Sequence, residues 1–184
     1  VIMQDLQPSS DPIVFADAYV KKVCVEKFDT NGDGELSYKE AASVTSMESC
    51  FFGDYAGVVT QFNELQYFTS LDRLYKTFSG CSNLQSVTIS DSVISIGKDA
   101  FRDCSSLTSI TIPDNVISMS QYVFYGCHNL QSITIGKGLK SIKQETFLSC
   151  GPIHSVYIAD MDAWYNIAFE DVYCNPMGGG ANLY

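Results

Sequence analysis

Hydrophobic residues recur at a fixed interval along the second half of the chain. Cysteines stand 23 residues apart at positions 81, 104, 127 and 150, and other apolar residues keep the same register around them. A period of this length is typical of a repeat architecture. The pattern predicts three full units, 82–104, 105–127 and 128–150. The apolar columns are Phe78, Phe101, Phe124 and Phe147; Leu84, Leu107, Leu130 and Ile153; Val87, Ile110, Ile133 and Val156; and Ile89, Ile112, Ile135 and Ile158.

Each unit contains a short alternating segment, such as Ser-Ile-Thr-Ile at 109–112. Alternation of polar and apolar residues predicts a strand with one buried face. One unit cannot bury its apolar edges alone, but units stacked at about 4.8 Å form a continuous core. We therefore predict an α/β repeat solenoid, a right-handed coil of 23-residue units joined by short parallel strands.

The repeat register weakens at both ends of the predicted solenoid, which we assign to residues 62–158. Residues 62–81 end in the repeat pattern but lack its alternation, so we expect an atypical, partly helical first unit. Residues 159–184 form an irregular C-terminal repeat or cap, in which Trp164 and Phe169 are expected to fill the core. Residues 1–61 are expected to form a helical N-terminal cap.

Residues 29–40 read DTNGDGELSYKE, which matches the twelve-residue loop of an EF-hand. The pattern predicts a calcium site, because hard oxygen ligands of this number favour Ca²⁺ over transition metals. Gly34 stands where such a loop turns sharply. The predicted ligands are the side chains of Asp29, Asn31, Asp33, Ser37 and Glu40 and the backbone carbonyl of Glu35.

Apolar residues at helical spacing lie on both sides of this loop and predict two helices. Asp17 is a plausible cap of the first helix, and the second is expected from Tyr38 to Met47. EF-hands normally pair, yet no second loop follows, and Leu36 stands where a partner loop would bridge. Three hypotheses remain open: a structural calcium that stiffens the cap, a loop without metal, and a signalling switch or dockerin-like docking module.

The formal net charge of −10 disfavours nucleic acid and anionic membranes as partners, since both are bound by clustered Lys and Arg. No apolar run is long enough to cross a bilayer. The sequence begins at Val1 without the pattern of a signal segment, so we expect either that a targeting segment was removed or that none existed. No enzyme signature is found, and the two histidines are expected at the surface. The sequence predicts a non-enzymatic chain.

The four cysteines of the repeat column are expected to be buried free thiols, because parallel side chains in one column seldom reach disulfide geometry. Cys24, Cys50 and Cys174 lie outside the column, and a disulfide among them is possible.

The outward positions of the predicted strands form two columns of hydroxyl side chains. They represent either a polar recognition surface or a face that only keeps the sheet soluble. The candidate surface consists of Ser86, Thr88, Ser109, Thr111, Ser132, Thr134 and Tyr157, with Ser155 in the serine column.

The unit CSSLTSITIPDNVIS, closed by a Phe-x-x-Cys pattern, resembles the BspA-like leucine-rich repeats of bacterial surface proteins over about residues 62–158. The calcium loop followed by residues 62–68 is similar to the leader of such proteins. The resemblance implies a secreted or cell-surface module that adheres to host-matrix or bacterial surface proteins. The alternative is a structural spacer that presents another domain and has no ligand of its own.

Overall fold

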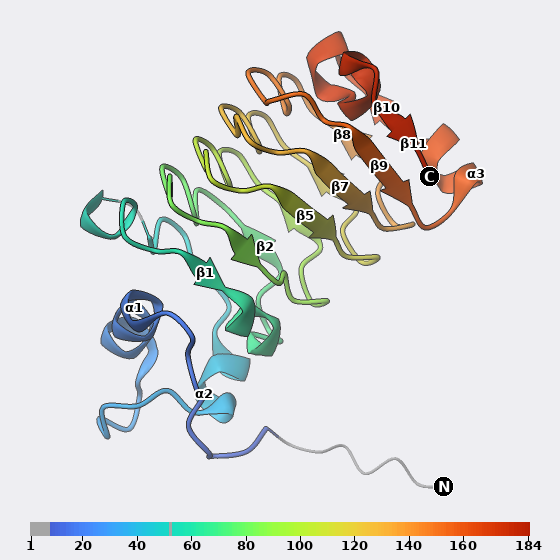
Figure 1. Ribbon diagram of the computed structural model, residues 1–184. Coiled ribbons are helices and arrows are strands. Elements are labelled where there is room, and N and C mark those ends of the chain that lie inside the picture. Colours follow the sequence, from blue (N-terminus) through green and yellow to red (C-terminus); the bar gives the residue numbers. More distant parts are fainter. Residues whose placement is uncertain (1–7, 52) are drawn as a thin grey trace, which may run out of the picture.

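Parallel strands stack coil upon coil along the computed structural model, which describes residues 8–51 and 53–184 (Figure 1). The strands follow one another from the N-terminal to the C-terminal end, and two helices lie beside the first coil. The prediction of a repeat solenoid with parallel strands is confirmed. The domain boundaries remain predictions, and residues 1–7 and 52 of the predicted cap lie outside the described residues.

One sheet has the strand order β11-β9-β7-β5. Ser109 pairs with Ser132, and Ser132 with Ser155, so equivalent residues of successive coils lie side by side. The isoleucines of β5 are buried and its polar residues are exposed, as the alternation predicts. Two shorter strands, β1 and β3, pair in the same direction nearer the N-terminus. The strands are β1 (Gln61–Phe62), β3 (Ser86–Val87), β5 (Ser109–Ile112), β7 (Ser132–Ile135), β9 (Ser155–Ile158) and β11 (Asn182–Leu183).

A second parallel sheet, with the order β10-β8-β6-β4-β2, forms another side of the coil. Each of its strands has two residues, and the second residue of each of the central three, Ile96, Met119 and Ile142, is fully buried. The strands are β2 (Arg73–Leu74), β4 (Ser95–Ile96), β6 (Ser118–Met119), β8 (Ser141–Ile142) and β10 (Ala168–Phe169).

A stack of phenylalanine rings runs through the core between the coils. Phe101 lies 5.2 Å from Phe78 and 5.5 Å from Phe124, centroid to centroid, with the rings nearly parallel. The stack continues to Phe147 at one end and to Phe51 at the other. Phe51 precedes the predicted first unit, so the ring column begins inside the segment that we assigned to the cap.

The cysteine column consists of free thiols that bond to the preceding coil. The Sγ–H of Cys104 donates to the carbonyl of Phe78 at 3.2 Å, and that of Cys127 donates to the carbonyl of Phe101 at 3.1 Å. Burial raises the pKa of Cys81 and of Cys150 to about 12. Since the thiolate is the reactive form, these residues serve as small apolar side chains with a weak donor.

The described part of the N-terminal segment contains two α-helices and one 3₁₀ helix, and a second 3₁₀ helix follows in the first coil. Asp17 caps the first helix, as predicted, by accepting the backbone N–H groups of Tyr19 and Val20. The second helix was expected to reach Met47 but ends at Ser43, because Val44 adopts an extended conformation and packs into the hydrophobic core. The elements are α1 (Ala18–Phe28), α2 (Tyr38–Ser43), η1 (Gly53–Tyr55) and η2 (Asn63–Tyr67).

The last coil departs from the repeat, as the sequence indicates. A short helix replaces the turn after β9, and its Trp164 is buried and packs edge-on against Phe169 with ring centroids 5.6 Å apart. Gly180, with a φ of 83°, turns the chain into β11. The elements of this coil are α3 (Met161–Tyr165), η3 (Val172–Cys174) and η4 (Pro176–Gly179).

Candidate functional site

The predicted calcium loop connects α1 to α2 and folds back on itself through its own side chains. The carboxylate of Asp29 accepts the backbone N–H of Gly32 at 2.7 Å and that of Gly34 at 2.9 Å. Both glycines have positive φ angles, 75° and 82°. This conformation costs glycine little, so the two glycines let the backbone close around Asp29.

Two further predicted ligands also accept backbone hydrogen bonds within the loop. Asn31 Oδ1 accepts from the N–H of Asp33, and Asp33 Oδ1 accepts from the N–H of Glu35, each at 2.8 Å. Such short-range bonds fix the side chains of loop residues relative to the backbone. The Glu35 carboxylate forms an ion pair with Lys21 at 2.7 Å. This pair leaves the predicted calcium ligand of Glu35 unaffected, because that ligand is the backbone carbonyl.

Glu40, the last predicted ligand, is the most strongly hydrogen-bonded side chain of the loop. Its Oε1 accepts from the N–H and Oγ1–H of Thr30 and the N–H of Asn31, and its Oε2 accepts from the N–H and Oγ–H of Ser37. These hydrogen bonds, chiefly the one from the backbone N–H of Ser37, lower the pKa of Glu40 to about 2. Glu40 is therefore ionised at neutral pH while it closes a capping box with Ser37 at the start of α2.

The predicted ligands thus share one loop. Within residues 8–51 and 53–184, however, no three His, Cys, Asp or Glu side chains lie together as a metal-binding group. The oxygen ligand types and the glycine turn fit calcium, whereas Glu40 already uses both carboxylate oxygens for hydrogen bonds. The calcium site therefore stays a prediction.

The position where a second EF-hand would pair is filled by the chain's own N-terminal segment. The N–H of Ile13 donates to the carbonyl of Leu36 at 2.8 Å, and the N–H of Tyr38 donates to the carbonyl of Asp11 at 3.1 Å. Ile13 and Leu36 are both buried, and Pro12 and Ser37 form an antiparallel bridge. The loop thus has an internal partner, which the EF-hand pattern alone does not reveal.

Partly buried polar contacts join this segment to the residue before β1 and to η2 of the first coil. Asp17 Oδ2 accepts from the N–H of Thr60 at 2.7 Å and from its Oγ1–H at 2.8 Å, while Glu64 Oε1 accepts from the N–H of Ala16 at 3.0 Å. Aromatic pairs add contacts on both sides of the loop: Phe28 with Phe68, and Tyr38 with Tyr67. The loop is therefore attached to the solenoid through both helices that flank it.

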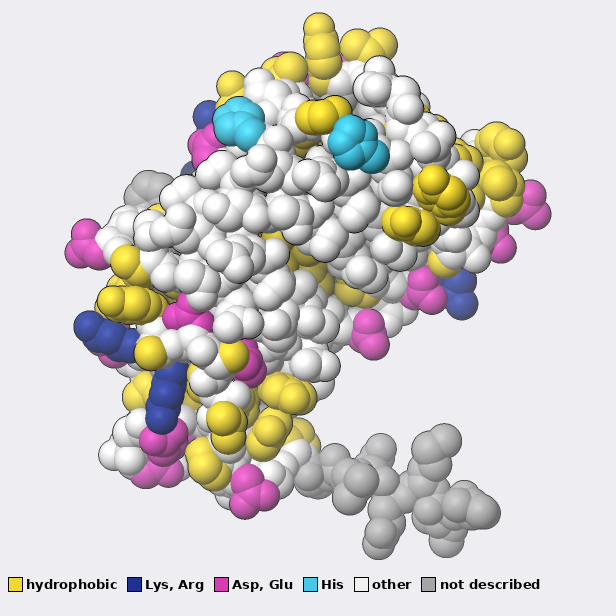
Figure 2. All heavy atoms as spheres, in the orientation of Figure 1, with side chains coloured by type: hydrophobic (Ala, Val, Ile, Leu, Met, Phe, Trp, Pro, Cys, Tyr) yellow, Lys and Arg dark blue, Asp and Glu magenta, His cyan; other side chains and the backbone are white. Residues whose placement is uncertain are grey.

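The second candidate site is the solvent face of the sheet β5-β7-β9-β11. Thr111 pairs with Thr134, and Thr134 with Tyr157, while the serines form a parallel column beside them. Figure 2 shows the middle of this face as nearly free of charged and hydrophobic side chains. The structure brings together Ser109, Thr111, Ser132, Thr134, Ser155 and Tyr157 on this face.

The two columns extend beyond the residues that the sequence singled out. Asn63, in the first coil, donates its amide N–H to Ser86 Oγ and accepts from Thr88 Oγ1, both at 3.3 Å. At the other end, the ring of Tyr184 stacks on Tyr157 with centroids 5.1 Å apart. Both were missed because the repeat register that locates the columns is interrupted before residue 82 and after Ile158.

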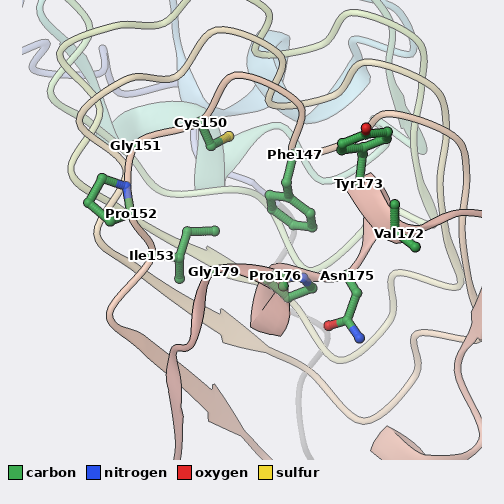
Figure 3. Close-up of a pocket in the computed structure, with 11 residues that line it drawn as sticks. Phe147, Cys150, Gly151, Pro152, Ile153, Val172, Tyr173, Asn175, Pro176 and Gly179 are labelled. Carbon is green, nitrogen blue, oxygen red and sulfur yellow. The ribbon is translucent and has the colours of Figure 1, made fainter.

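An open pocket of about 400 Å³ lies at the last coil (Figure 3). Phe147, Ile153 and Pro176 form its apolar wall, and Tyr173 and Asn175 contribute polar atoms. None of its lining residues is charged or a histidine. Its one thiol, that of Cys150, has a pKa raised to about 12 by burial and is therefore protonated at neutral pH.

None of the helices in the described part of the chain is long and apolar enough to span a membrane.

The repeat matches a known protein family. The family described as "BspA type Leucine rich repeat region" matches residues 51–175 in six copies. A leucine-rich repeat protein from Bacteroides ovatus ATCC 8483 has a similar structure, with 27% identity and a TM-score of 0.51 over 74% of this chain and 38% of that protein. No curated protein matches the chain.

Two further solved structures have lower scores. A leucine rich cell surface protein from Faecalibacterium prausnitzii A2-165 is 21% identical, with a TM-score of 0.49 over 61% of this chain and 33% of that one. The T. pallidum leucine rich repeat protein is 22% identical, with a TM-score of 0.43 over 61% of this chain and 62% of that one. The chain thus spans less than two thirds of the length of each of these proteins. Because the family match covers most of the chain and agrees with the stacked parallel strands, the chain belongs to the BspA-type leucine-rich-repeat family.

Proposed function

We propose that the chain is a non-enzymatic protein-binding module of a secreted or cell-surface protein, and that it adheres through the solvent face of the sheet β5-β7-β9-β11. The observation that carries this proposal is the in-register pairing of Thr111, Thr134 and Tyr157. Polar side chains that repeat in register along a sheet offer many weak contacts, which is how repeat proteins bind extended partners.

A spacer without a ligand of its own is the competing function, and substitution of the threonine column separates the two. Thr111→Glu combined with Thr134→Glu places two like charges side by side at the centre of the face, whereas the buried face of the sheet is unchanged. We expect binding to purified extracellular-matrix and bacterial surface proteins, measured by surface plasmon resonance, to fall at least about tenfold, the equivalent of about 1.4 kcal/mol.

The matched control is Thr45→Glu combined with Ser46→Glu, which places the same two charges at exposed positions in the N-terminal segment. Binding that survives the double substitution supports the spacer. Loss of binding in the control as well would show a general effect of charge.

We further propose that the loop binds one calcium ion that stiffens the N-terminal cap. The ligands would be Asp29, Asn31, Asp33, Ser37 and Glu40 with the carbonyl of Glu35. The glycine turn and the oxygen-rich ligand set support this proposal. Bound calcium would neutralise the clustered acidic side chains, and the attachment of both flanking helices to the first coil would pass this rigidity to the solenoid.

Calcium is expected to stabilise the fold by mass action, by about 2.7 kcal/mol at a concentration one hundred times its Kd. Asp33→Asn tests the site cleanly, because asparagine keeps the Oδ1 that accepts the Glu35 N–H but removes one negative charge. We expect the calcium-dependent rise in Tm to shrink in this variant and to persist in Asp54→Asn, an exposed acid outside the loop. Isothermal titration that detects no heat at millimolar calcium would remove the metal from the proposal.

A further inference from the structure

A pair of stacked aromatic rings continues the threonine column in the last two coils. Tyr157 and Tyr184 stand where the preceding coils have Thr111 and Thr134, and their rings lie 5.1 Å apart with planes inclined by 22°. The two tyrosines are 45% and 61% exposed. The C-terminal end of the face therefore differs in chemistry from its centre.

Further exposed apolar side chains follow directly on α3. Met161 is 47% and Tyr165 is 75% exposed. Met161 is four residues from Tyr157, so the two Cα atoms are at most about 14 Å apart. Figure 2 shows hydrophobic side chains gathered at this end of the face, near the C-terminus that Figure 1 marks. Tyr157, Tyr184, Met161 and Tyr165 are called here the aromatic end surface.

Acidic residues outnumber basic ones in the last coil, which carries the aromatic end surface. Residues 144–184 contain five acidic residues and neither lysine nor arginine. Of the three lysines in the preceding coil, two have acidic partners: Lys143 pairs with Glu170, and Lys137 Nζ lies 3.6 Å from Asp114 Oδ2. Lys140 forms no ion pair within the described residues. Asp160 and Asp162, which flank Met161, are exposed and form no ion pair within the described residues.

We propose that the aromatic end surface binds an arginine-rich segment of the partner protein. Exposed tyrosine faces attract cations, and the planar guanidinium of arginine stacks on them better than the compact, strongly hydrated ammonium of lysine. Asp160 and Asp162 add attraction for the same charge. This inference rests on the proposed function, since it names the chemistry of the partner at one end of the same face.

The test uses the full chain and three synthetic peptides of equal length, in which serine alternates with arginine, lysine or glutamate. We expect the arginine peptide to bind most tightly in fluorescence anisotropy. Tyr157→Thr with Tyr184→Thr restores the residue type of the other coils and leaves every charge in place. This double variant should raise the Kd for the arginine peptide about five- to thirtyfold, as expected for the loss of two exposed cation–π contacts.

The control variant Tyr19→Thr removes an exposed tyrosine from α1 and should leave the affinity unchanged. An unchanged Kd in the double tyrosine variant would overturn the proposal, because the peptide would then be held only by the overall negative charge. Equal binding of the glutamate peptide would overturn it as well. Either result is distinct from failure of the proposed function, which is measured with the double threonine variant at the centre of the face.

Discussion

Replacing Phe101 with alanine is expected to lower the free energy of unfolding by about 4 kcal/mol. The side chain is fully buried, and its ring stacks on Phe78 on one side and on Phe124 on the other. The substitution loses the transfer free energy of the ring, leaves a cavity, and removes two aromatic contacts at once. Denaturant unfolding followed by circular dichroism measures the change.

Phe147→Ala provides the matched comparison, because Phe147 is 8% exposed and, among the described residues, its ring stacks only on Phe124. We expect a smaller loss of stability at this position. Equal losses for Phe101→Ala and Phe147→Ala would contradict the view that the ring column couples neighbouring coils.

Replacing Asp17 with alanine is the second large expected effect, a loss of about 2 kcal/mol. Its buried carboxylate caps α1 and also accepts two hydrogen bonds from Thr60 of the first coil. The alanine variant loses the cap and the link between the N-terminal segment and the solenoid. Thermal unfolding measures the difference, and Asp54→Ala, at an exposed acid, should have little effect.

The contribution of Asp17 should also depend on pH. Burial raises its pKa, but hydrogen bonds from Thr60, Val20 and Tyr19 outweigh burial and lower it overall. A carboxyl group with a lowered folded-state pKa stabilises the fold above its unfolded pKa of about 4 and loses this contribution as the pH falls. The difference between the wild type and Asp17→Ala should therefore shrink as the pH falls below about 4. A difference that grows on acidification would contradict this assignment.

The repeat was predictable because each apolar column is set by one physical requirement, the burial of equivalent residues in stacked coils. Ile110 and Ile133 alternate with polar residues, and this alternation alone identifies their strands. The ends were less predictable, since no column constrains them. The early end of α2 at Ser43 and the start of the ring column at Phe51 depend on packing between segments that the local pattern does not contain.

In the candidate sites, too, the sequence predicted what depends on local spacing and missed what depends on contacts between distant segments. The EF-hand pattern located the loop from Asp29 to Glu40, yet it contained no sign that Ile13 would pair with Leu36. That contact joins segments far apart in the sequence, and local spacing cannot reveal it. Likewise, the strand register located Tyr157 on the binding face, but Tyr184 joins it only through the pairing of β11 with β9.

The column of free thiols gives each coil its own chemical reporter. Because Cys81, Cys104 and Cys127 are fully buried and protonated, an alkylating reagent reaches each one only when its coil opens. Repeat folds can open from their ends inward, one unit at a time. The order in which these three cysteines become modified in mild denaturant would therefore record the direction in which the solenoid unravels, without any introduced probe.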